Sequence, residues 1–292
     1  MISPPADLAG LINTFYIIET DEVAVPETVP AYSAQLLVVV RGRIRFTYAD
    51  GSTGTTGTVT FNAPQMRSAQ CVMEGPLLEV GVSFTHVAWQ KLANLPADRV
   101  HDRLIPAEQI LAPDRIAALE AAALACAEGR IAPDALCTPL AAAVASGRHA
   151  IRPDHVAAVE AISRWLVSGF DPPLTDLYDN VSLSCRQLQR ISRRFFGVAP
   201  AQVLKRFRAH RAAMVLAQPG ISEEVFDALM ATYFDQAHLI RDIRRYTGRT
   251  PSQLRSKYRG HGLLDPAGHG DAGVLLNSPP KDFPAAEPAL RL

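Results

Sequence analysis

The sequence has no net charge and only four cysteines. The first feature bears on the partners that the protein can bind, and the second on disulfide bonds and metal sites. Its 29 Lys and Arg residues balance 29 Asp and Glu residues, so the average charge does not indicate a polyanionic partner. No secretory segment precedes the first strand-like run, and the cysteines fall at no Cys-x-x-Cys or other metal-binding spacing. We therefore expect a protein of the reducing cytoplasm. The four are Cys71, Cys126, Cys137 and Cys185.

Long apolar runs and catalytic patterns are also missing. No stretch reaches the length of about 18 residues that spans a bilayer, which argues against a membrane protein. Metal-dependent barrels cluster imidazoles, for example as His-x-His, but His86 is the only histidine before His101. There is no Gly-x-Ser-x-Gly elbow and no evident Cys/His nucleophile pair. We therefore expect no metal, no cofactor and no enzymatic activity.

The balanced total conceals a strong charge asymmetry along the chain. Residues 183–259 hold 15 Lys and Arg against 5 Asp and Glu, which leaves 14 basic and 24 acidic residues elsewhere out of 29 of each. A chain of 292 residues with 48% hydrophobic content is long enough for two domains. Such a split favours a polyanionic partner for one domain only.

Short β-type runs occupy residues 35–84. They read QLLVVV, RIRFTY, TVTF and LLEVGVSF. Turn signals separate them, at Arg41-Gly42, Asp50-Gly51 and Asn62-Ala63-Pro64. Strands at this spacing predict an antiparallel sandwich or barrel, to which we assign residues 1–112.

Alanine-rich helices follow the strands. Residues 113–150 predict two helices, with Gly129 and Gly147 as stops. Their Ala/Leu faces are too apolar to stand alone, so they pack either on the β-rich domain or on a second copy of the chain, as a linker or as dimerisation helices of a homodimer. Residues 260–292 have no periodicity, and we expect them to form a flexible terminus.

A basic helix-turn-helix unit is predicted at residues 174–197. Ser184 is a natural N-cap, and Leu188, Ile191 and Phe195 then recur at helical spacing as one apolar stripe. Residues 174–180 form a short helix before it, joined by a tight connection, which makes a helix-turn-helix of ordinary size.

A second unit repeats the pattern 51 residues later. Asp235 is the N-cap, and Leu239, Ile243 and Tyr246 form the apolar stripe. A first helix capped by Ser222 precedes it. The two units bracket one long helix at residues 200–217, whose basic residues are Lys205, Arg206, Arg208 and Arg211.

These segments resemble a known family in order and spacing. LSCRQLQRISRRFFGVAP, RFRAHRAAMVLAQ and YFDQAHLIRDIRRYTGRTPSQLR are similar to the DNA-binding domain of AraC/XylS-type bacterial transcription regulators over about residues 153–258. The match ends in the family's Gly-x-Thr-Pro-x-x-x-Arg close, at Gly248, Thr250, Pro251 and Arg255. Tyr178 and Thr232 depart from the pattern, which usually has alanine and glycine there. The resemblance implies that residues 151–259 bind double-stranded DNA, with both second helices in successive major grooves.

Residue chemistry and the resemblance assign the same base contacts. Arginine donates a bidentate pair to guanine, and glutamine can donate and accept at adenine. The residues expected at base edges are Arg186, Gln189, Arg190, Gln236 and Arg241. Residues beside or behind them are expected to hold phosphates, which sets register and salt dependence. These are Arg193, Arg194, Lys205, Arg208, Arg244, Arg245 and Arg249.

The resemblance further implies that the N-terminal domain senses a small-molecule effector or dimerises, and RNA polymerase is a further expected partner. The expected fold class is α+β, with a cupin-like barrel or sandwich followed by an all-α domain that carries two helix-turn-helix units. A ligand pocket with aromatic walls and one cation is a hypothesis beside the alternative that the same residues are core. Its residues would be Phe46, Tyr48, Phe61, Met66, Arg67 and Trp89.

An alternative function gives the first domain chemistry of its own. Cys71 in AQCVMEG suggests an alkyl-accepting thiol, or the barrel acts as an enzyme that the helical domain delivers to DNA. The neighbours of Cys71 supply no obvious activating base. We therefore expect this cysteine to be buried in the core and the protein to be a regulator.

Overall fold

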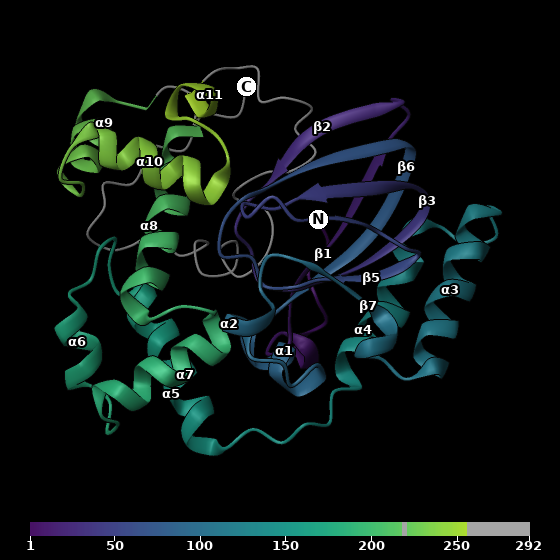
Figure 1. Cartoon of the computed structure of the whole chain (residues 1–292), viewed down its shortest axis with the longest axis horizontal. Helices are drawn as coiled ribbons and strands as arrows, with labels where there is room; N and C mark the ends of the chain where they lie inside the picture. Colours follow the sequence, from purple (N-terminus) through teal and green to yellow (C-terminus); the bar gives the residue numbers. More distant parts are fainter. Residues whose placement is uncertain (218–220, 256–292) are drawn as a thin grey trace.

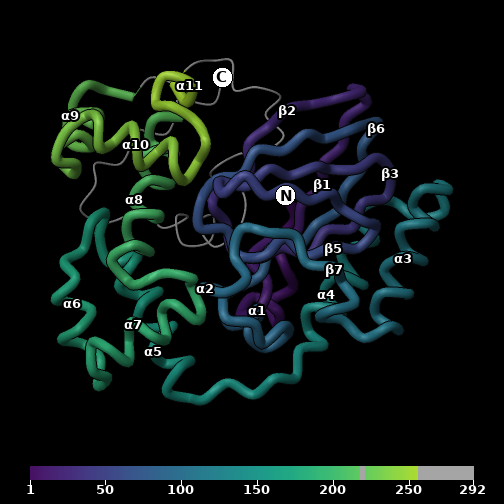
Figure 2. Tube along the Cα trace, viewed as in Figure 1, coloured from purple at the N-terminus to yellow at the C-terminus, as the bar shows by residue number. Residues whose placement is uncertain are grey.

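The computed structural model describes residues 1–217 and 221–255, and these fall into two halves that follow one another in the sequence. The N-terminal half, residues 1–150, is built on an antiparallel sheet with helices beside it (Figure 1). The helical half, residues 151–217 and 221–255, carries both helix-turn-helix units. The trace in Figure 2 shows the two halves side by side. The predicted flexible terminus at 260–292 lies outside the described residues.

In the described residues, seven strands form one antiparallel sheet of order β1-β6-β3-β5-β7, with β2 paired to β6 and β4 paired to β3. The strands are β1 (Ile12–Thr20), β2 (Ala24–Val29), β3 (Gln35–Thr47), β4 (Thr53–Thr55), β5 (Val59–Asn62), β6 (Ala69–Phe84) and β7 (Leu104–Pro106). The long β3 and β6 pair along most of their length and carry the rest of the sheet.

The prediction of a turn at Arg41-Gly42 is wrong, because β3 runs through it as one strand. The register against β6 shifts on both sides of Arg41, which is the signature of a bulge. Gly42 has φ +75°, and a Cβ there would press on the Glu74 and Pro76 carbonyl oxygens. A glycine that permits positive φ serves a bulge and a turn equally well, so the local sequence does not distinguish them.

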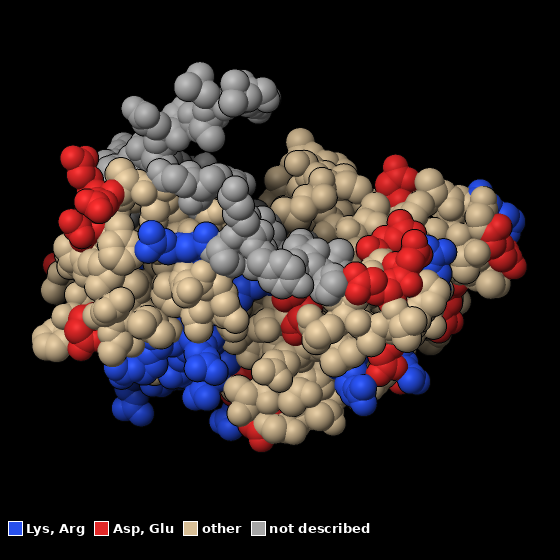
Figure 3. All heavy atoms as spheres, turned by 90° about the horizontal axis from the view of Figure 1, so that it is seen from above, with Lys and Arg blue, Asp and Glu red and all other residues tan. Residues whose placement is uncertain are grey.

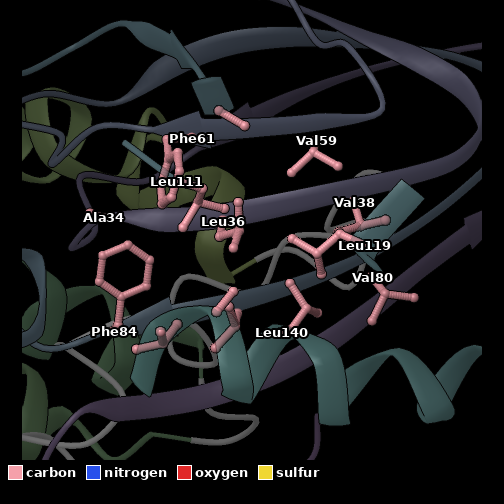
Figure 4. Packing of buried hydrophobic residues seen from close by; sticks show 14 of the residues in the cluster. Ala34, Leu36, Val38, Val59, Phe61, Val80, Phe84, Leu111, Leu119 and Leu140 are labelled. Carbon is pink, nitrogen blue, oxygen red and sulfur yellow. The ribbon is translucent and has the colours of Figure 1, made fainter. Parts of the chain in front are cut away.

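Both faces of the central strands are buried, which explains their continuous apolar runs. Leu36 and Val38 point into one hydrophobic cluster, while Leu37 and Val39 point into another on the opposite face. Figure 4 shows the first cluster, where residues of β3, β5 and β6 meet Leu119 and Leu140 from two helices.

Those two helices are α3 (Pro113–Ala127) and α4 (Cys137–Ala145), and they cover the sheet of the same chain. Leu119 and Leu140 are fully buried in its core. Of the two predicted packing partners, the sheet is therefore the one that buries these apolar faces. Leu124, on the outside of α3, is exposed. The homodimer stays a prediction.

The remaining helices include both predicted helix-turn-helix units. They are α1 (His86–Leu92), α2 (Ala97–Val100), α5 (Pro153–Val167), α6 (Leu174–Asp179), α7 (Cys185–Phe196), α8 (Pro200–Ala217), α9 (Glu223–Ala231), α10 (Gln236–Thr247) and α11 (Pro251–Arg255), with 3-10 turns at Ala6–Leu8, Ala107–Gln109 and Pro133–Leu136. The side chains of Ser184, Ser222 and Asp235 accept the capping hydrogen bonds, which confirms the three predicted N-caps. Within the described ranges, no helix has both the length and the hydropathy that crossing a bilayer demands.

Helix α8 connects the two units, but its arginines do not form the basic outer face that their number suggests. Arg206, Arg208 and Arg211 are only 1%, 8% and 3% exposed, and Lys205 alone of the four basic residues is exposed. Arg211 donates to the carbonyl oxygens of Leu166, Gly169 and Phe170 in the chain that leaves α5. Burial of these charges is tolerated because each guanidinium finds oxygen partners.

We expect Arg211→Ala to destabilise the protein by about 3 kcal/mol or more, because it leaves three carbonyl oxygens without their donor and opens a cavity. Lys205→Ala on the same helix should change stability by less than about 0.5 kcal/mol. Urea unfolding of both variants measures the difference. Equal midpoints would show that the buried guanidinium does not hold α8 in place.

Candidate nucleic-acid interface

The second helices of the two units, α7 and α10, are built alike. Each has 12 residues, a side-chain N-cap and a left-handed glycine at its C-terminal end. The predicted apolar stripes are buried in both, against other helices of the same half, and Tyr246 of α10 also packs on Ala31 of the N-terminal half. At Ser184 a full capping box forms, because Gln187 accepts from the Ser184 backbone while Ser184 accepts from Gln187. The caps and the buried stripes therefore fix α7 and α10 in place, and the side of each helix opposite its stripe is held in a defined position.

The predicted base contacts lie on these presented sides. Four of the five are exposed, namely Arg186, Arg190, Gln236 and Arg241. Gln189 is half-buried, and its amide nitrogen lies 3.4 Å from the Tyr178 hydroxyl oxygen. Tyr178, where the family usually has alanine, therefore helps to orient Gln189 from the first helix of the unit. The turn of the second unit is also unstrained, because Thr232 has φ −81°.

The predicted phosphate contacts divide into two groups. Arg193, Lys205, Arg244 and Arg245 are exposed. Figure 3 shows Lys and Arg side chains gathered along one edge of the helical half, whereas both signs are scattered over the sheet half. Such a basic edge is the electrostatic footprint expected of a surface that meets a polyanion. The side chains of the other three, Arg194, Arg208 and Arg249, are bonded to other residues of the protein.

The predicted phosphate role of Arg208 does not agree with its placement. Its Nη1 lies 2.7 Å from Asp171 Oδ2, its Nη2 lies 3.7 Å from Asp242 Oδ2, and its guanidinium stands over the Tyr233 ring. Asp171 precedes the first unit and Asp242 is on α10, so Arg208 links the segment that leads into the first unit to the second unit. A charge that is 8% exposed and paired in this way stabilises structure instead of meeting solvent.

Both presented helices end against the N-terminal half. At α10, the Ser68 backbone and hydroxyl donate to the Arg245 carbonyl oxygen, and the Ala31 backbone donates to that of Tyr246. At α7, the Gln90 side chain donates to the Arg194 carbonyl oxygen. Two loops and helix α1 of the N-terminal half thus satisfy carbonyl groups that helix ends leave unpaired.

The two glycines at these ends approach the N-terminal half closely. Gly197 has φ +84° and Gly248 has φ +73°, which only glycine adopts without strain. A Cβ on Gly197 would overlap the Met66 side chain, and one on Gly248 would overlap Thr28. The close-packed contact therefore explains these glycines as much as the helix caps do.

Charged groups complete the contact between the halves. Arg249 Nη2 lies 2.8 Å from Glu27 Oε1, and their side chains are 12% and 7% exposed. Arg194 donates to the Asn94 side-chain oxygen at 2.7 Å. Sequence reasoning missed Glu27 and Asn94, because residues 100 or more positions away from their partners carry no local pattern that marks them.

The hypothetical ligand pocket is not one site in this structure. Phe46 and Tyr48 pack in one cluster, while Phe61 and Trp89 pack in the cluster on the other face of the sheet. Met66 and Arg67 lie in the loop that faces the helical half. The physical reason is that Phe46 on β3 and Phe61 on β5 point to opposite faces of the sheet, and the sequence of a single strand does not show which face it shares with another strand.

A small cavity does exist on the face of the sheet to which Leu37 points. It has a volume of about 20 Å³, about enough for one water molecule. Glu79 reaches it, and burial raises the pKa of that carboxyl to about 7, although a hydrogen bond from the Tyr16 hydroxyl opposes the shift. The lining residues are Tyr16, Ile18, Val29, Tyr32, Gln35, Leu37, Ile44, Phe46, Cys71, Met73 and Glu79.

The thiol of Cys71 is buried at this cavity, as expected. Burial raises its pKa well above the ordinary value, and the negative charges of Glu27 and Glu79 add to the shift. Because the thiolate is the reactive form, this environment suppresses nucleophilic chemistry.

Comparison with known proteins gives a family match in the region just described. Residues 177–257 match the family model described as a helix-turn-helix domain, of the AraC type. A search of curated proteins finds no match.

Among solved structures, ToxT from Vibrio cholerae is similar in two forms. One has 9% identity and a TM-score of 0.47, covering 83% of this chain and 97% of that one. The other, with an unsaturated fatty acid bound, has 12% identity and a TM-score of 0.47, covering 87% and 99%. On the family match and the two capped units, residues 177–257 are a DNA-binding helix-turn-helix domain of the AraC type.

Proposed function

We propose that this regulator reads two DNA boxes, about one helical turn apart, with the exposed sides of α7 and α10. The observation that carries the proposal is the paired seating of the two helices on α8, each with its C-terminal end against the N-terminal half. Their N-terminal turns then point away from the sheet. Two reading helices held by one connecting helix fit adjacent major-groove faces about 34 Å apart.

The exposed residues take separate roles in this proposal. Sequence is read by Arg186, Gln189, Arg190, Gln236 and Arg241, because guanidinium and amide groups match the major-groove edges of guanine and adenine. Phosphates are held by Arg193, Lys205, Arg244 and Arg245. Arg194, Arg208 and Arg249 instead keep the two halves and the two units together, as their internal partners support.

The N-terminal half is assigned the input of the regulator, with residues 1–150 sensing a small molecule or dimerising and residues 151–259 binding DNA in the cytoplasm. A contact path supports this assignment. Tyr32 lines the sheet cavity, and its ring stacks on His210 of α8 with centroids 5.7 Å apart. Any change that moves Tyr32 therefore acts on the helix that carries both units. RNA polymerase remains the proposed downstream partner.

The alternative of an alkyl-accepting thiol receives no support from the Cys71 environment. The side chain is 4% exposed and its thiolate is disfavoured by burial. We therefore propose a regulator without chemistry of its own.

The base-reading assignment is tested on a duplex selected from a random pool by the full chain. Arg190→Ala and Arg241→Ala should each weaken binding to this site by about 1 to 3 kcal/mol and relax preference at one base position, in different boxes, because each removes a base-edge donor. Arg115→Ala, at a partly exposed arginine on α3, is the control and should bind as the parent does. Equal losses on specific and random duplexes, measured by fluorescence anisotropy, would assign both arginines to phosphates.

The docking of the halves is tested at the buried ion pair. Glu27→Ala strands the Arg249 charge, so it should cost about 3 kcal/mol and speed amide exchange at Ala31 and Ser68, the backbone donors beside it. Glu19→Ala breaks an exposed pair with Arg41 and should cost at most about 1 kcal/mol. If amide exchange at both donors is unchanged in Glu27→Ala, the ion pair does not hold the halves together.

A further inference from the structure

A cleft between the two halves gathers arginines that the DNA-reading proposal does not account for. It has a volume of about 480 Å³ and lies where the chain around α2 faces α5 and α7. This is within the range of small-molecule sites. Its lining residues are Gln90, Asn94, Pro96, Asp98, Arg99, Ala150, Ile151, Arg152, His155, Arg190, Ile191, Arg194 and Phe195.

Four of the lining residues are arginines, and they come from both halves of the chain. Arg99 belongs to α2, Arg152 caps the start of α5, and Arg190 and Arg194 are one turn apart on α7. Asp98 is the only acid in the lining. The cleft therefore carries an excess of positive charge that comes from three separate elements.

The guanidinium groups are only partly satisfied by the protein. Arg152 pairs with Asp154, whose Oδ2 lies 2.7 Å from its Nη2, and Arg194 donates to the neutral side chain of Asn94. Within residues 1–217 and 221–255, the guanidinium groups of Arg99 and Arg190 form no hydrogen bond or ion pair. Like charges converge here without a matching number of carboxylates, which costs free energy that an anionic ligand would recover.

The pKa of His155, which also lines the cleft, responds to the positive charge of these arginines. Burial lowers the pKa of its imidazole, and the positive charges of Arg152, Arg190 and Arg194 lower it further, while Asp154 opposes the shift. Arg99 and Asp98 face it from α2 across the cleft. A bound anion would offset the arginines, so it would raise the pKa of His155.

We propose that this cleft binds a free small molecule with two or more anionic groups, either carboxylates or phosphates. The planar guanidinium fork suits both groups, and four forks from three elements can hold at least two of them at once. A polar lining with few aromatic side chains fits a hydrophilic metabolite better than a lipid.

The cleft ligand would also act on DNA binding, a consequence that rests on the proposed function. Arg190 lines the cleft and is a proposed base contact, so a ligand that engages it competes with the duplex. By thermodynamic linkage, bound DNA then lowers the affinity of the cleft for the ligand by the same factor. The cleft is thus an effector site at the domain boundary, separate from the cavity in the sheet.

Titration calorimetry of the full chain with pyrophosphate and with citrate, at constant ionic strength, tests the binding. We expect saturable binding, weakened about tenfold in Arg99→Ala and in Arg152→Ala, because each removes a charge-assisted contact. Acetate, with one charge, should bind much more weakly. Arg130→Ala is the control, since Arg130 is exposed and pairs with Glu128 beyond the end of α3.

Two further readouts separate a built site from general charge screening. In proton NMR, pyrophosphate should raise the pKa of His155 in the parent and in Arg130→Ala, but much less in Arg99→Ala. In anisotropy at constant ionic strength, pyrophosphate should weaken DNA binding by the parent but not by Arg99→Ala, which lies outside the proposed DNA contacts.

The outcomes distinguish this inference from the proposed function. No saturable binding of either probe, or equal binding by the parent and Arg99→Ala, overturns it. If no free anion binds and Arg99→Ala instead weakens DNA binding, the cleft holds a phosphate of the duplex and the inference is also overturned. If pyrophosphate binds as expected but the chain binds no DNA, the cleft inference stands and the proposed function fails.

Discussion

Three buried guanidinium groups on α8 set the positions of the other parts of the molecule. Arg206 donates to the Gln65 carbonyl oxygen of the N-terminal half, Arg208 pairs with acids before α6 and on α10, and Arg211 donates to carbonyl oxygens after α5. A buried cation is stable only where such partners stay in place. The sheet, the first unit and the second unit are therefore fixed relative to one helix.

This arrangement places the proposed reading residues and the contact with the N-terminal half on the same two helices. The N-terminal turns of α7 and α10 carry exposed arginine and glutamine, while their last carbonyl groups are bonded by the N-terminal half. A ligand that shifts the N-terminal half acts on both helix ends together. The sheet cavity near Tyr32 and the arginine cleft beside α7 offer two routes for such a shift.

Local patterns predicted the reading units, because caps and apolar stripes depend on neighbours within one or two turns. Ser184, Asp235 and the stripe at Leu239 could be identified for that reason. The burial of the α8 arginines could not be predicted, because their partners are largely backbone oxygens and acids distant in the sequence, which no residue spacing indicates. The bulge at Gly42 resembled a turn, and the two faces of the sheet separated Phe46 from Phe61, since strand register is not written in any one strand.

The spacing of the two DNA boxes tests the rigid two-headed account most directly. The measurement is the affinity of the full chain, at fixed salt, for its selected duplex with and without about five base pairs inserted between the boxes. Half a turn moves the second groove to the far side of the duplex, and bending so short a segment costs on the order of several kcal/mol. The account predicts that affinity falls about a hundredfold or more, to that of a single box. Unchanged affinity would show that the heads are flexibly joined or that only one of them touches DNA.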